Sequence, residues 1–79
     1  MELKNHRKNH PWYQLVNSLD RAKYVKYLRC EAGCTWRAVA QYCSNEWQGD
    51  WGSHQIAGMY ICETAADFLG EDASKEPWN

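Results

Sequence analysis

Apolar side chains recur every three or four residues in this chain, which is the spacing of one face of an α-helix. The most regular series is Trp36, Val39, Ala40, Cys43 and Trp47. Thr35 stands just before this series, and a threonine hydroxyl at that place accepts a hydrogen bond from the first helical turn. The pattern therefore predicts a helix over about 36–47.

A second helix is predicted over about 54–70, with Gly70 at its end. Its apolar arc is wide, about half of the circumference, which is typical of a helix that packs against two neighbours. Part of this arc is built from small residues, namely Gly58, Cys62, Ala65 and Ala66. Small side chains allow another backbone to come close. Glu63 and Asp67 mark the opposite side, where we expect them in solvent.

Two further helices are predicted in the first half of the chain. Gly33 can adopt the positive φ that ends a helix, and it closes a helix over about 18–32. Pro11 suits a first helical position and begins a short helix over about 11–16. The expected fold class is all-α, a small bundle of three main helices with a short N-terminal helix. The predicted core is Leu19, Val25, Leu28, Trp36, Val39, Ala40, Cys43, Trp47, Ile61, Cys62, Ala65 and Phe68.

The length of 79 residues is enough for one domain. We expect a single helical domain over 11–70, a flexible basic tail over 1–10 and an acidic tail over 71–79. The net charge of −1 conceals an asymmetry, because residues 1–33 carry +4 and residues 34–79 carry −5. Opposite halves of this kind can attract each other within one fold or between copies.

No apolar run approaches the ~20 residues of a membrane span, and the basic N-terminus lacks the apolar stretch of a secretion signal. We therefore expect a cytoplasmic protein that does not contact membranes.

Aromatic residues supply the main functional hypothesis. Five Trp and five Tyr in so short a chain can fill a small core or form a partner surface. The candidates for partner binding are Trp51, Trp78 and Tyr27. Trp51 lies between two glycines in a turn, and Trp78 lies in the acidic tail, so each is either packed onto the domain or a partner anchor. The sequence favours a small non-catalytic protein–protein interaction module that can also self-associate.

Basic residues supply the alternative, a helical nucleic-acid-binding domain. Lys23, Lys26 and Arg29 alternate with aromatic residues, as phosphate-binding and base-stacking surfaces do. The segment GCTWRAVAQYC resembles the second helix of a helix-turn-helix motif. A recognition helix should follow after a tight turn, but here a longer connection leads to an acidic helix. Nucleic acid is therefore the second choice of partner.

The four cysteines, Cys30, Cys34, Cys43 and Cys62, are expected to be structural thiols, since two lie on apolar helix faces and free cysteine behaves as a small hydrophobe. A zinc-stabilised domain and disulfides are the alternatives, although no Cys-x-x-Cys pair occurs. Motifs for a nucleophile, a phosphate loop or a catalytic metal are absent from the sequence. We expect neither an enzyme nor a bound cofactor.

Overall fold

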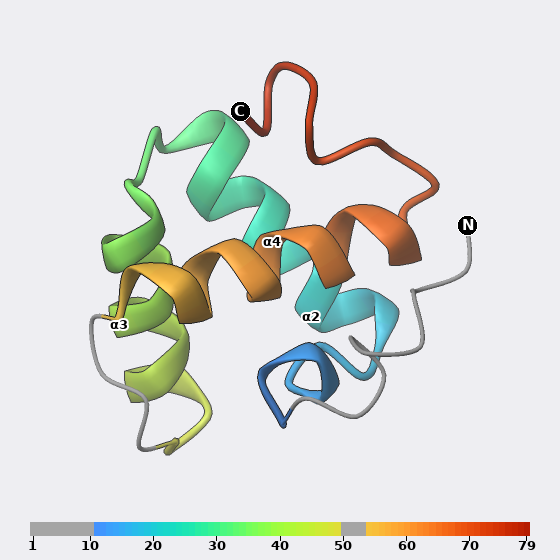
Figure 1. Ribbon diagram of the computed structural model, residues 1–79. Coiled ribbons are helices and arrows are strands. Elements are labelled where there is room, and N and C mark those ends of the chain that lie inside the picture. Colours follow the sequence, from blue (N-terminus) through green and yellow to red (C-terminus); the bar gives the residue numbers. More distant parts are fainter. Residues whose placement is uncertain (1–10, 50–53) are drawn as a thin grey trace.

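The computed structural model describes residues 11–49 and 54–79, and all regular elements in these ranges are helical. The predicted all-α fold with three helices is confirmed (Figure 1). The elements are the 3₁₀ turn η1 (Pro11–Gln14), the α-helix α2 (Leu19–Lys26), the π-helical turn η2 (Tyr27–Glu31), and the α-helices α3 (Trp36–Glu46) and α4 (Gln55–Phe68).

Side-chain caps fix the starts of two helices. The Ser18 hydroxyl accepts a hydrogen bond from the Arg21 amide at 3.3 Å, and the Thr35 hydroxyl accepts one from the Ala38 amide at 3.1 Å. Each cap satisfies a backbone N–H that has no partner within its helix. The predicted role of Thr35 is therefore confirmed, and Gly33 adopts the expected positive φ of 72°.

The predicted helices at about 11–16 and 18–32 are only partly correct. The first is a single 3₁₀ turn, and the second changes from α to π geometry after Lys26. In the π turn the Ala32 amide donates to the Tyr27 carbonyl, five residues back, at 2.8 Å. Such turns are rare and often lie at functional sites. The spacing of apolar residues did not reveal this change.

Helix α4 packs against both α2 and α3, and it lies across them (Figure 1). At the crossing with α3, a Cβ atom added to Gly58 would lie 1.8 Å from the Trp36 carbonyl oxygen. Only a residue without a side chain fits there. The expectation that small residues of this helix admit another backbone is confirmed at Gly58.

One continuous core lies between the helices, and it includes most of the predicted positions. Two predictions were wrong, because Leu19 is 48% exposed and Phe68 is 47% exposed. Both residues lie at the ends of their helices. The buried side of α2 is centred on Ala22 and Val25, and Leu19 lies outside it. Trp36 and Trp47 are half-buried at the edge of the core. The prediction omitted six buried apolar residues, namely Tyr13, Val16, Ala22, Ala57, Ala66 and Trp78.

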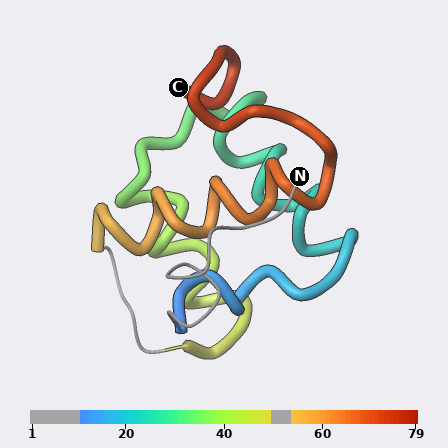
Figure 2. The backbone as a smooth tube through the Cα atoms, turned by 45° about the vertical axis from the view of Figure 1, so that its right-hand side comes forward, coloured from blue at the N-terminus to red at the C-terminus, as the bar shows by residue number. Residues whose placement is uncertain are grey.

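After α4 the chain turns back over the helices and ends beside the junction of η2 and α3 (Figure 2). Within the two described ranges, no helix is long and apolar enough to cross a membrane.

Candidate functional site

The C-terminal segment, residues 71–79, folds back onto the helices and is attached through Trp78. This side chain is 1% exposed and belongs to the continuous core. Of the two alternatives for Trp78, the structure therefore describes the packed one, and in this position a partner cannot reach the indole. The burial of a large apolar side chain is the main force that holds the segment in place.

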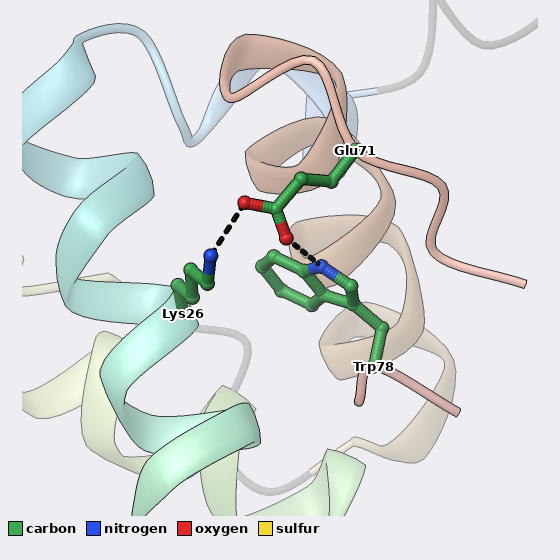
Figure 3. A network of polar contacts seen from close by, with 3 residues as sticks. All are labelled: Lys26, Glu71 and Trp78. Atoms are coloured by element: carbon green, nitrogen blue, oxygen red, sulfur yellow. Dashed lines mark hydrogen bonds and ion pairs between the residues drawn. The ribbon is translucent and has the colours of Figure 1, made fainter. Parts of the chain in front are cut away.

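Glu71 connects this segment to α2 (Figure 3). One carboxylate oxygen accepts a hydrogen bond from the Trp78 indole Nε1 at 2.9 Å, and the other forms an ion pair with the Lys26 ammonium group. The Lys26 hydrogen bond, followed by that of the indole, lowers the pKa of the Glu71 carboxyl group. The same ion pair raises the pKa of Lys26. At neutral pH both groups are therefore charged.

Arg29 makes a second connection, from the π turn η2. Its Nε donates to the Trp78 carbonyl oxygen at 2.7 Å, and its Nη1 donates to the Cys34 carbonyl oxygen at 2.7 Å. The guanidinium group also lies over the Trp36 ring, 4.6 Å from the ring centroid. Arg29 thus joins the end of the chain to the start of α3.

These contacts change the interpretation of the basic face on residues 23–29. Lys26 is paired with Glu71, and Arg29 is bonded to two carbonyl groups. Lys23 is exposed. The structure therefore does not bring the three nucleic-acid candidates together as one free basic surface.

An acidic pocket lies between α4, the start of α3 and the C-terminal segment, with a volume of about 360 Å³. Small-molecule pockets generally span about 300–1,000 Å³, so this one suits a single side chain or a small ligand. Its lining residues are Trp36, Met59, Cys62, Glu63, Asp67, Asp72, Ala73, Ser74, Trp78 and Asn79. Among the residues that the structure describes, this lining includes three carboxylates and two indoles, and neither lysine nor arginine.

The carboxylates of the acidic pocket come from two parts of the chain. Glu63 and Asp67 lie four residues apart on α4, and Asp72 comes from the C-terminal segment. Glu63 accepts a hydrogen bond from the Tyr13 hydroxyl at 3.3 Å. Asp72 accepts bonds from the Ser74 hydroxyl at 2.6 Å and the Ser74 amide at 2.9 Å, and these lower its pKa. The Asp72 carboxylate is therefore anionic at neutral pH.

The sequence prediction missed this pocket. It placed Glu63 and Asp67 in solvent, whereas both are half-buried and line the cavity. Their spacing of four residues showed that they share a helix face. The folding back of Trp78, which forms another part of the lining, had no comparable local signal.

The cysteines are four free thiols in this structure. Cys43 and Cys62 are buried, and burial raises the pKa of each thiol to about 12. Cys30 and Cys34 are half-buried. Among the described residues, no group of three or more His, Cys, Asp or Glu side chains is arranged to hold a metal ion.

The other predicted partner residues lie elsewhere. Tyr27 is 53% exposed on η2 and does not line the pocket. Trp51 lies outside the described residues. Two exposed apolar side chains that the prediction did not include, Tyr42 and Ile56, lie on α3 and α4.

Comparison with protein-family models, curated proteins and solved structures returned no match, so the fold and the pocket are the basis for functional inference.

Proposed function

We propose that this protein is a small, non-catalytic interaction module that binds a basic side chain of a protein partner in the acidic pocket. The observation that carries the proposal is the composition of this pocket. Carboxylates from α4 and from the C-terminal segment line one cavity together with two indoles, and none of the described lining residues is a lysine or an arginine.

This composition favours an organic cation over a bare metal ion. The half-buried indole of Trp36 and the side chain of Met59 offer apolar and aromatic surface. A cation over an aromatic ring is attracted by the ring electrons, and a guanidinium group can also pair with carboxylates in its own plane. An arginine side chain combines both features with the required size.

The ligand test uses two acetylated, amidated tripeptides, Gly-Arg-Gly and its neutral counterpart with citrulline in place of arginine. The full-length protein, labelled with ¹⁵N, is titrated with each peptide at low salt. The expected result is a saturable shift of the indole N–H signals of Trp36 and Trp78 with the arginine peptide. The citrulline peptide has the same shape without the charge, so equal shifts with both peptides would contradict the proposal.

A pair of matched variants locates the binding site. Asp67→Asn removes one charge from the pocket, and Asp20→Asn removes the same charge from an exposed position on α2. A charge-assisted hydrogen bond contributes about 1.5–3 kcal/mol. Loss of the Asp67 carboxylate should therefore weaken binding roughly ten-fold or more, whereas Asp20→Asn should bind like the wild type. Equal effects of both variants would indicate general electrostatic attraction and would rule out this pocket.

A partner can also be a second copy of the chain, as the opposite charges of its two halves suggest. Sedimentation velocity at increasing protein concentration tests this form of the proposal. The nucleic-acid and zinc alternatives have no comparable supporting observation among the residues described.

A further inference from the structure

Residues 72–79 have a structure of their own. The Lys75 amide donates to the Asp72 carbonyl at 3.1 Å, and the Trp78 amide donates to the Lys75 carbonyl at 3.0 Å. Asn79 Nδ2 donates to the Ser74 carbonyl at 3.2 Å. These hydrogen bonds join residues of the segment to one another and not to the helices.

The attachment of this segment to the helices depends on one residue. Ala73 is half-buried and the other residues of 72–77 are exposed, whereas Trp78 is buried. The place that receives it, which we call the Trp78 site, consists of the core beneath the indole and two polar partners. Glu71 accepts the indole N–H, and Arg29 donates to the Trp78 carbonyl oxygen.

Both polar partners are held independently of Trp78. Lys26 binds the second carboxylate oxygen of Glu71, and the Glu71 amide donates to the Ala66 carbonyl at the end of α4 at 2.8 Å. Arg29 is bonded to the Cys34 carbonyl. Glu71 and Arg29 therefore each keep a partner on the helices that does not involve residues 72–79.

We propose that the Trp78 site is a recognition site for the C-terminal segment that also accepts this segment from a second copy of the chain, so that two copies exchange their tryptophans. The occupant is identified by the residue that fills the site in this structure, since a second copy presents the same indole and the same carbonyl group. The six residues 72–77 span at most about 20 Å when extended, which is enough to cross between two touching surfaces. The polar contacts of the Trp78 site, Glu71 and Arg29, do not line the acidic pocket, whereas Asp72 and Trp78 of the segment do, so in an exchanged dimer the segment of the second copy completes the pocket.

Binding within one chain has the advantage of a high effective concentration, about millimolar for a short linker. We therefore expect a monomer at low protein concentration. Exchange becomes dominant when the segment can no longer return to its own site, which is how shortened loops produce swapped dimers.

The first test supplies the segment as a fluorescein-labelled peptide, DASKEPWN, to the full-length Trp78→Ala variant. Fluorescence anisotropy should show saturable binding to this variant and no binding to the wild-type protein, whose site is filled. The same peptide with Trp78→Ala should not bind. Equal binding of the two peptides, or no binding to the folded variant, would overturn the proposal.

Trp78→Ala can also fail to fold, because it removes a large core side chain. In that case circular dichroism at 222 nm is recorded during the titration. Recovery of helical signal with the tryptophan peptide alone supports the proposal, and the lack of recovery contradicts it.

A further substitution tests the contacts of the Trp78 site. Glu71→Ala, added to Trp78→Ala, removes the acceptor of the indole N–H, and peptide binding should weaken roughly ten-fold. The matched control is Glu46→Ala, which removes an exposed carboxylate from α3 and should leave peptide binding unchanged. Equal loss with both variants would show that binding depends on charge alone.

The second experiment tests exchange itself. Deletion of residues 73–75 keeps the Trp78 site and the tryptophan but shortens the connection between them. Sedimentation velocity should then show a dimer, and the Trp78 indole N–H should stay protected from solvent exchange. A monomer, whether folded with an exposed tryptophan or unfolded, would refute the proposal.

Discussion

The close crossing of α4 and α3 provides a sharp test of the fold. Gly58→Ala adds one methyl group at a position where the Cβ atom would lie 1.8 Å from the carbonyl oxygen of Trp36 and 2.5 Å from its carbonyl carbon. Real Cβ contacts are longer than 3.0 Å. The atoms that must move belong to the backbone, so no change of rotamer relieves the clash.

Two effects of opposite sign determine the result. Alanine is a better helix former than glycine by about 1 kcal/mol, which favours the variant. Overpacking typically costs 1–3 kcal/mol and sometimes more, and a backbone clash belongs at the upper end. We expect Gly58→Ala to lower the free energy of unfolding by about 2 kcal/mol. For a domain of this size that corresponds to a fall in Tm of roughly 10 °C.

Urea unfolding followed by circular dichroism measures this free energy. Gly70→Ala is the control, because Gly70 has a φ of 70° and no atom within 4 Å of the added Cβ. Its cost is limited to the left-handed backbone, about 1 kcal/mol. If Gly58→Ala is as stable as the wild type or more stable, the crossing is not as close as described and helix propensity dominates.

Three further predictions concern buried and charged groups. Cys43 and Cys62 have thiol pKa values raised from 9.0 to about 12, so their contribution to the free energy of unfolding is complete below pH 9 and is lost as the pH rises toward 12. At pH 10 the free energy of unfolding should therefore be lower by roughly 1.4 kcal/mol per thiol than below pH 9. Alanine at either position should halve this decrease. Thr64→Val removes the buried hydroxyl that donates to the Tyr60 carbonyl at 3.0 Å, and urea unfolding should show a loss of about 1 kcal/mol. Because the pKa of Glu71 is lowered, its carboxylate stabilises the folded protein above the usual pKa of 4.5, and this stabilisation is lost as the pH falls through the lowered value. Acid titrations should show a smaller pH dependence of stability for Glu71→Gln than for the wild type, and an unchanged pH dependence would contradict the described ion pair.

Local signals made most of the helices predictable. Thr35 caps α3 as expected because capping depends on a few neighbouring residues. The small residues of α4 indicated a close neighbour, and Gly58 has one. Both features follow from the order of residues along one helix.

The acidic pocket and the Trp78 site could not be predicted in the same way. Trp78 lies in a polar segment without periodicity, so its burial depends on contacts with residues about fifty positions earlier. The π geometry of η2, which carries Arg29, likewise has no signature in the apolar pattern. Long-range contacts set these features, and one sequence alone does not specify which segments meet.

The position of Arg29 has a consequence for how the molecule comes apart. One guanidinium group holds the last turn of the chain, the carbonyl group before α3 and the ring of Trp36. The backbone of Trp36 is also the surface against which Gly58 packs. Release of the chain end therefore removes one of three contacts of Arg29, and the other two still join this side chain to the start of α3 near its crossing with α4. Lysine at position 29 retains the charge but has only one nitrogen on a flexible stem, so Arg29→Lys should allow the amides at the start of α3 to exchange with solvent through local opening, well before the helices separate.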